Sequence, residues 1–179
     1  MATAVRPGRY RSGVEVGVRR GEDTEAFDAF VRARLPHLLR FGRALTGDDH
    51  AAADLVQDAL ERTLLRWSKV TSEDPEGYVR RAMVNRSISV WRKLGRERLT
   101  GELPQQSYDD QPRDAVLLDA LRRLAPRQRA VIALRYYEDL TEAQTAEILG
   151  CSVGTVKSQS SLAIARLRGL LDETTEELT

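Results

Sequence analysis

Side chains suited to DNA recognition gather near the C-terminus of the sequence, in the stretch CSVGTVKSQSSLAIARLR from Cys151 to Arg168. Glutamine can make a bidentate contact with adenine, hydroxyl groups can contact several bases, and lysine can contact a phosphate. At helical spacing, these polar residues share one face while Val156, Ala163 and Leu167 face inward. The candidate DNA-contacting residues are Ser152, Thr155, Lys157, Ser158, Gln159 and Leu162.

Two helices and a tight turn are expected to position these residues. A short helix packs through Ala146, Gly150 supplies the left-handed turn that ends it, and Ser152 caps the next helix. This pattern predicts a helix-turn-helix, whose second helix enters the major groove with its N-terminal half at the base edges. The alternative is an αα-hairpin packed in a helical core.

An acidic ridge is predicted on another helix, in the stretch GDDHAAADLVQDALERTLLRW. Its members lie three and four residues apart, on the side away from the apolar stripe that contains Val56. They are Asp54, Gln57, Asp58 and Glu61. Because carboxylates do not bind phosphates, the ridge is either solvated surface or a contact for a basic protein.

A basic helix that also carries aromatic residues is predicted from about Pro75 to Arg96, with Asp74 and Pro75 as a cap and first-turn pair. Aromatic rings can stack on unpaired bases while arginines follow the backbone of a single strand. Tyr78 and Trp91 could equally be core anchors, so this pattern leaves two interpretations open.

Helical periodicity extends over most of the 179 residues, and a composition of 41% apolar and 31% charged residues is typical of a folded protein. Thr24 is expected to cap a first helix that Pro36 kinks or divides. Gly47 should end that helix, and Asp48 or Asp49 should cap the next one. Further helices are expected near 114–124, 126–138, 141–149 and 153–170, and no strand-like alternation is seen.

The predicted fold class is all-α, with two small helical domains joined by a flexible linker. The expected divisions are a disordered basic arm at 1–23, a first domain at 24–98, a linker at 99–113, a second domain at 114–171 and an acidic tail at 172–179. Basic and acidic residues are segregated along the chain, which favours a polyanionic partner for the basic segments.

Several function classes are excluded by what the sequence lacks. The sequence has no apolar run long enough to span a membrane and no secretory signal, which predicts a cytoplasmic protein without membrane insertion. It has a single cysteine, Cys151, and no cluster of metal-ligating residues, so no metal or cofactor is expected. His37 and His50 are isolated and are expected at the surface or at helix ends. No nucleophile lies beside a base, so an enzyme is not expected.

Three stretches together resemble the extracytoplasmic-function (ECF) group of the sigma-70 family, the dissociable promoter-recognition subunits of bacterial RNA polymerase. They are DLVQDALERTLLRW, PEGYVRRAMVNRSISVWRK and LAPRQRAVIALRYYEDLTEAQTAEILGCSVGTVKSQ. The resemblance implies that residues 24–98 correspond to region 2 and residues 114–171 to region 4. The 25 arginines and three lysines are typical of a GC-rich genome, such as that of an actinobacterium.

The resemblance also implies roles for the candidate surfaces. The acidic ridge corresponds to the region 2.2 motif that binds the coiled coil of the β′ subunit, and region 4 would contact the flap of the β subunit. The loop at 68–77 and the helix after it correspond to the part that opens the minus-10 element. The candidate residues there are Tyr78, Arg80, Arg81, Asn85, Trp91, Arg92 and Lys93. The helix-turn-helix would read the minus-35 element, and an anti-sigma factor is a further partner that the resemblance allows.

The sequence departs from the family at several positions. Ser89 stands where many members have aspartate, Gln144 and Thr145 replace an acidic and aliphatic pair, and the recognition helix is less basic than most. The promoter sequence therefore cannot be borrowed from relatives. The rival class is a stand-alone helix-turn-helix transcriptional regulator, which would normally need an effector or dimerisation domain and would not need the acidic ridge.

Overall fold

The computed structural model describes residues 13–71, 73–97 and 112–177, and every element in them is helical. The elements are α1 (Gly13–Thr46), α2 (Asp49–Leu64), α3 (Trp67–Val70), α4 (Pro75–Glu97), α5 (Pro112–Arg122), α6 (Pro126–Ile132), the π-helical turn η2 (Ala133–Tyr137), α7 (Glu142–Leu149) and α8 (Val153–Glu177). The all-α prediction is confirmed. The linker predicted at 99–113 lies almost entirely outside the described residues, as does the basic arm before Gly13.

Local chemistry sets the ends of the helices where the sequence predicts it. Gly47 has a φ of 72°, a left-handed conformation that glycine adopts without steric cost, and it ends α1. Asp48 then caps α2, because its side chain accepts a hydrogen bond from the backbone of Ala51 at 2.7 Å. Asp74 caps α4 in the same way, accepting from the backbone of Gly77 at 2.9 Å.

Some predicted boundaries are wrong. Helix α1 begins at Gly13 rather than at Thr24, and of the two outcomes expected at Pro36, a kink or a division, the division does not occur. Burial on both sides of the proline explains the continuity, because Phe27 precedes it and Leu38 follows it in the core. At the other end of the chain, the residues expected as an acidic tail continue α8 as far as Glu177.

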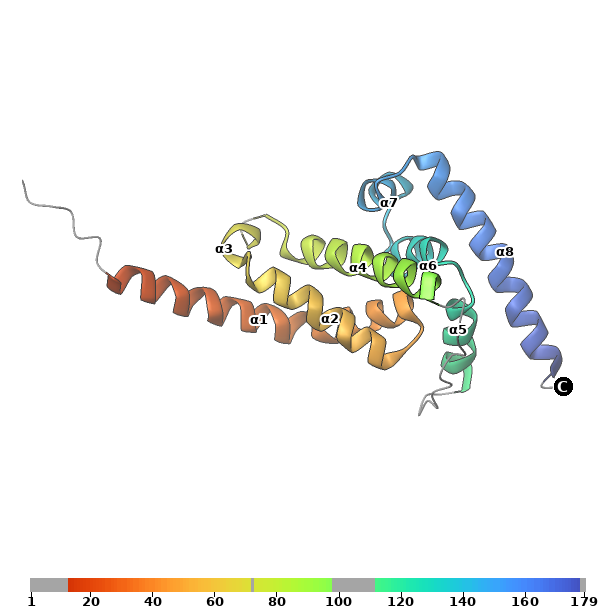
Figure 1. The fold of residues 1–179 in the computed structure, drawn as a ribbon, viewed down its shortest axis with the longest axis horizontal. Helices are drawn as coiled ribbons and strands as arrows, with labels where there is room; N and C mark the ends of the chain where they lie inside the picture. The colour runs from red at the N-terminus through yellow and green to blue at the C-terminus, as the bar shows by residue number, and fades with distance from the viewer. Residues whose placement is uncertain (1–12, 72, 98–111, 178–179) are drawn as a thin grey trace, which may run out of the picture.

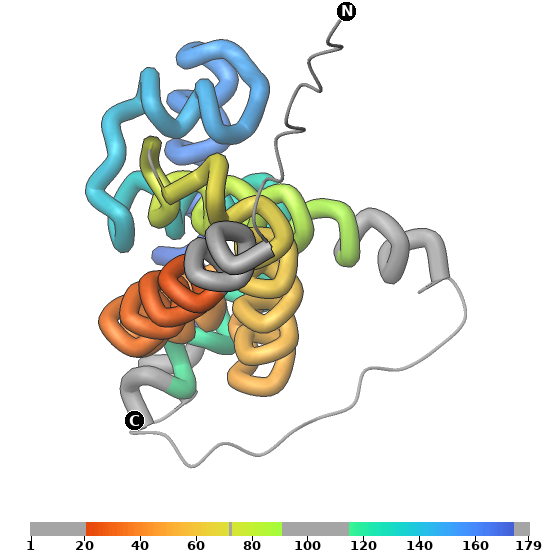
Figure 2. The backbone as a smooth tube through the Cα atoms, turned by 90° about the vertical axis from the view of Figure 1, so that its left-hand side faces the viewer, coloured from red at the N-terminus to blue at the C-terminus, as the bar shows by residue number. Residues whose placement is uncertain are grey.

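The helices form two units (Figure 1), which we call the N-terminal unit (α1–α4) and the C-terminal unit (α5–α8). In the N-terminal unit, α1 packs against α2 and α2 against α4. In the C-terminal unit, α8 packs against α5, α6 and α7. Figure 2, which views the molecule nearly along α1 and α2, shows α7 and the start of α8 above the N-terminal unit.

The two units share one hydrophobic cluster. From the N-terminal unit it takes Leu38 and Phe41 of α1 together with Met83 of α4, and from the C-terminal unit Ala130 and Leu134. All five side chains are at least 98% buried. The C-terminal unit also has two smaller hydrophobic clusters of its own, through which α5 and α6 pack against α8. The linker therefore joins two units that are packed against each other.

Candidate nucleic-acid and protein interfaces

The helix-turn-helix forms as the sequence predicts. Gly150 ends α7 with φ 60° and ψ 45°, and Ala146 is buried between the two helices. The Ser152 hydroxyl accepts a hydrogen bond from the backbone of Thr155 at 3.1 Å and so caps α8. Val156 and Ala163 are fully buried on the inner face of α8. These contacts fix the direction in which the outer face of α8 points.

The outer face of α8 carries the predicted DNA-contacting residues at different levels of exposure. Lys157, Ser158 and Leu162 are exposed, whereas Thr155 and Gln159 are half-buried. Three hydroxyls already have local partners, since the Ser152 hydroxyl lies 2.9 Å from the Thr155 hydroxyl and Ser158 donates to the Thr155 carbonyl. Leu162 is 56% exposed, which makes it a large apolar contact on this face.

The acidic ridge on α2 is confirmed as a helix face, but its four residues are not equivalent. Asp54 is exposed, and Gln57 donates to Glu61 at 2.9 Å along the same exposed face. Asp58 is only 31% exposed, because it accepts ion pairs from Arg62 at 3.1 Å and Arg86 at 3.2 Å. Asp58 is therefore half-buried, and its carboxylate connects α2 to α4.

The basic face of α4 is partly covered. Arg80 is 18% exposed and Arg81 53% exposed, and both reach toward the C-terminal unit. Tyr78 is half-buried and lines a cavity, so it is not a core anchor. Asn85 is exposed. The side chains of Trp91, Arg92 and Lys93 lie outside the described part of the structure.

Two family profiles match this chain in order, one on each unit. Sigma-70 region 2 matches residues 30–97, and sigma-70 region 4 matches residues 114–167. The chain belongs to the sigma-70 family. The N-terminal unit accordingly carries region 2, and the C-terminal unit carries region 4.

Curated relatives agree with this assignment and point to the ECF group. An RNA polymerase sigma-E factor of Streptomyces avermitilis is 41% identical over 152 residues, which cover 82% of this chain and 85% of the relative. The ECF RNA polymerase sigma factor SigL of Mycobacterium tuberculosis is 32% identical over 147 residues, covering 76% and 83%. Both sources are actinobacteria, in agreement with the arginine-rich composition.

A solved structure shows the same fold. The sigma factor RpoE of Bartonella quintana, crystallised with the anti-sigma factor NepR, is 28% identical with a TM-score of 0.63, covering 83% of this chain and 98% of that one. In the described part of this sigma factor, none of the helices combines the length and the apolar character that crossing a membrane requires.

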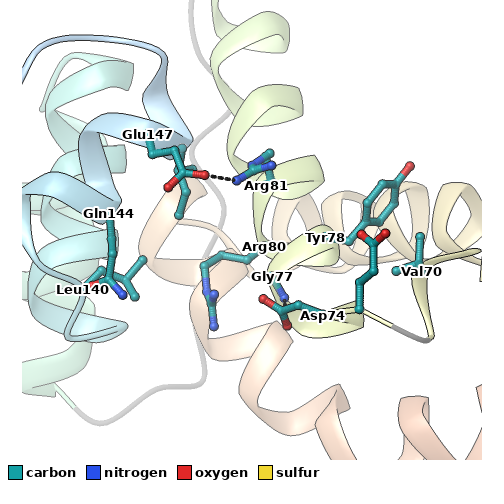
Figure 3. Close-up of a pocket in the computed structure, with 11 residues that line it drawn as sticks. Val70, Asp74, Gly77, Tyr78, Arg80, Arg81, Leu140, Gln144 and Glu147 are labelled. Atoms are coloured by element: carbon teal, nitrogen blue, oxygen red, sulfur yellow. Dashed lines mark hydrogen bonds and ion pairs between the residues drawn. The ribbon is translucent and has the colours of Figure 1, made fainter.

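A cavity of about 310 Å³ lies between region 2 and region 4. Figure 3 shows Tyr78, Arg80 and Arg81 of α4 on one side and Gln144 and Glu147 of α7 on the other. The Arg81 guanidinium donates to the Glu147 carboxylate across this cavity at 3.1 Å. Of the candidate minus-10 residues, Arg80 and Arg81 therefore contact region 4, and Arg81 is still 53% exposed.

Glu138 joins the two regions, and the sequence gives no reason to select it. It lies just after η2, its side chain is 4% exposed, and its two carboxylate oxygens contact region 2 on two helices. Oε2 lies 2.6 Å from Nε of Arg80, and Oε1 lies 2.8 Å from Nε2 of His37. His37 is thus a contact between the two regions, whereas the sequence predicts an isolated surface residue.

Two more residues of region 4 contact α1, and neither was predicted. The ring of Tyr137 stacks on His37 with centroids 5.4 Å apart, and its hydroxyl accepts from Arg40 at 3.1 Å. Arg129 is fully buried and donates to the carbonyl oxygen of Thr46 at 2.8 Å. Thr46 ends α1, where carbonyl groups lack helical partners and a positive charge is favourable.

Proposed function

We propose that this ECF sigma factor directs promoter-specific initiation through three separate surfaces, one for core RNA polymerase and two for DNA. The observation that carries the proposal is the presence of region 2 and region 4 in order on one chain. A stand-alone helix-turn-helix regulator would account for the region 4 match alone, and no comparison favours it.

The boundaries of these parts remain a proposal. We assign region 2 to residues 24–98, the linker to 99–113 and region 4 to 114–171, with the basic arm and the acidic tail outside them. The profile matches at 30–97 and 114–167 support this division.

We assign polymerase binding to the exposed part of the acidic ridge. Asp54, Gln57 and Glu61 offer carboxylate and amide groups that a basic surface of the β′ coiled coil can bind. Asp58 supports this face indirectly, because its ion pair with Arg86 joins α2 to α4. Region 4 would make the second contact, to the flap of the β subunit.

The minus-10 element is assigned to α4. Arg80 and Arg81 would follow the phosphates of the unpaired strand, and Tyr78 would offer a ring on which a base can stack. Asn85 lies one helical turn further along the exposed side. The sequence alone supports the assignment of Trp91, Arg92 and Lys93 to this surface. Removing a base from the duplex costs a few kcal/mol of stacking free energy, and such contacts can offset this cost.

The minus-35 element is assigned to the outer face of α8. Gln159 can make a bidentate contact with adenine, and Leu162 can contact the methyl group of thymine. Ser152, Thr155 and Ser158 offer hydroxyl groups, and Lys157 a phosphate contact. The chemistry of bond formation belongs to the polymerase, so we assign no catalytic residue or cofactor to this chain.

The partners and the cellular site follow from this role. We place the action of the protein in the cytoplasm, with the transcription machinery. We include an anti-sigma factor among the proposed partners, since the related RpoE was crystallised with one.

In vitro transcription tests the proposal directly. Purified protein and core RNA polymerase are incubated with fragmented genomic DNA, and the 5′ ends of the transcripts are mapped. We expect discrete start sites that share two upstream elements. Transcripts indistinguishable from those of core polymerase alone would contradict the proposal.

A further inference from the structure

The first half of α8 carries very little positive charge on its outer face. Its exposed residues recur at three- and four-residue spacing and so share one side of the helix: Gly154, Lys157, Ser158, Ser161, Leu162 and Ala165. Lys157 is the only basic residue in the sequence between Val153 and Ala165. Contacts with phosphates supply most of the sequence-independent affinity of a protein for DNA. On this part of the face, such a contact depends on one ammonium group.

A carboxylate lies beside that ammonium group. Nζ of Lys157 is 3.7 Å from Oε2 of Glu142, which belongs to the first turn of α7. The Lys157 side chain is 64% exposed and the Glu142 side chain 37% exposed. The two helices of the helix-turn-helix are therefore connected by an ion pair that solvent and DNA can reach.

The stability of the helix-turn-helix depends little on this ion pair. The N-terminus of α7 already has a capping box, in which the Thr141 hydroxyl accepts from the backbone of Gln144 at 3.2 Å. The Gln144 side chain accepts in turn from the backbone of Thr141 at 2.8 Å. Ala146 of α7 and Val156 of α8 pack together in a buried cluster. An exposed ion pair adds little to such packing, because water and salt screen it.

The ion pair lies where a helix-turn-helix meets the phosphate backbone. In a bound motif of this kind, the second helix lies in the major groove and the first helix crosses the backbone. A phosphate that approaches Lys157 therefore also approaches Glu142. Because the carboxylate already neutralises part of the lysine charge, a phosphate gains less attraction from Lys157 than from an unpaired lysine.

We propose that Glu142 is a positioning residue of region 4, which lowers the affinity for the minus-35 element by holding the ammonium group of Lys157. Glu142 contacts no base and acts on affinity through Lys157 alone. Binding by α8 then depends more on the base contacts of its neutral side chains. The proposal rests on the assignment of Lys157 to a phosphate contact.

Binding of the full chain to DNA tests the proposal, because Lys157 and Leu162 are exposed in the packed arrangement. The probe is a fluorescent duplex of about 20 base pairs, or two helical turns, that the parent chain enriches from a randomised library. Fluorescence anisotropy measures the affinity over a series of KCl concentrations. The variants are Glu142→Gln, Lys157→Gln and the two substitutions combined.

Asp172→Asn is the matched control, since it also removes one negative charge from region 4. Asp172 is exposed on α8. At a rise of about 1.5 Å per residue, it lies about 22 Å from Lys157 along the helix, beyond the Debye length of about 8–10 Å. Circular dichroism of each variant checks that the helical content equals that of the parent.

We expect Glu142→Gln to bind about threefold more tightly than the parent at about 0.1 M KCl, an effect typical of an exposed ion pair. The slope of log affinity against log salt should become steeper by up to about 0.9, the value for one phosphate contact. The control should change by less than about 1.5-fold, because its charge is screened from Lys157. In the Lys157→Gln background, Glu142→Gln should give no gain.

Two results would overturn the proposal. Equal affinities of Glu142→Gln and Asp172→Asn would show that net charge alone sets the effect. An equal gain from Glu142→Gln with and without Lys157 would show that the carboxylate acts on DNA directly.

The role of Glu142 and the phosphate contact of Lys157 can fail separately. If Lys157→Gln changes neither affinity nor salt slope in the Glu142→Gln background, Lys157 contacts no phosphate and both assignments fail. If Lys157→Gln weakens binding there while Glu142→Gln alone leaves the parent affinity unchanged, only the role of Glu142 fails. Neither result depends on polymerase, so failure of the sigma-factor assignment in transcription is distinguishable from both.

Discussion

The Oε2 atom of Glu138 in region 4 lies 2.6 Å from Nε of Arg80 in region 2, although 58 residues separate the two in sequence. His37 contacts the other oxygen of the same carboxylate at 2.8 Å. A carboxylate that is 4% exposed needs such partners, because an unpaired buried charge is costly. This pair connects the fold to the function: it stabilises the packed arrangement and occupies an arginine assigned to promoter DNA.

The acidic ridge predicts two different outcomes for two aspartates. Asp54→Lys should weaken binding to core polymerase and change the free energy of unfolding by less than about 0.5 kcal/mol, because Asp54 is exposed. Asp58→Lys should lower the free energy of unfolding by about 1–3 kcal/mol, because it places a positive charge beside Arg62 and Arg86. Pull-down with core polymerase and urea denaturation measure the two effects. If core polymerase pulls down Asp54→Lys as well as the parent, the ridge is solvated surface and not a polymerase contact.

The basic face of α4 predicts a defect in promoter opening. Arg80→Ala with Arg81→Ala should reduce strand separation more than polymerase binding, and should lower the salt slope of DNA binding by about one for each lost phosphate contact. Permanganate footprinting measures the opening. Arg32→Ala with Arg123→Ala is the control, since Arg32 is exposed on α1 and Arg123 pairs with Asp119 on α5. Normal melting by the first variant would contradict the placement of the strand.

On the outer face of α8, we expect Gln159 to contact a base and so set sequence preference, and Lys157 to contact a phosphate and so set affinity alone. Gln159→Ala should relax the preference at one or two adjacent base pairs, since a bidentate pair is worth about 1–3 kcal/mol of discrimination. Lys157→Ala should weaken binding about equally across sequences. Selection from a library with a randomised minus-35 element compares them. If Gln159→Ala and the parent select the same consensus sequence, Gln159 makes no base contact. The base contacts would then be assigned to Thr155, Ser158 and Leu162.

Two glycines of region 4, one in the turn before α8 and one within α8, are expected to change the free energy of unfolding differently when replaced by alanine. Gly150→Ala should lower the free energy of unfolding by about 1–2 kcal/mol, because Gly150 has a φ of 60° that disfavours any side chain. Gly169→Ala should be neutral or raise that free energy by up to about 1 kcal/mol, because this helical glycine has space around it. Thermal denaturation of both variants is the measurement, and equal destabilisation would contradict the strain argument.

Features set by neighbours in sequence could be predicted. Gly47, Asp48 and Asp74 end or cap helices through contacts within a few residues, and Gly150 with Ser152 defines the turn before α8. The all-α class followed from the same periodicity. The continuity of α1 through Pro36 could not be predicted, because it depends on the burial of residues on both sides of the proline by other helices.

Contacts between distant residues could not be predicted in this way. The spacing of the acidic ridge places Asp58 on a helix face, but only the packing of α4 brings Arg86 to 3.2 Å from it. His37, Arg129 and Glu138 carry no local pattern, and each acquires its role from a partner in the other unit. Charge segregation indicated a polyanion partner for α4, and gave no sign that region 4 supplies carboxylates to the same face.

Transcription from a single promoter fragment tests the central claim most directly. A template that carries one mapped start site is incubated with core RNA polymerase alone and with core polymerase plus this chain. A chain that carries region 2 and region 4 in order predicts a discrete transcript only when the chain is present. An equal yield of that transcript from core polymerase alone would contradict the account.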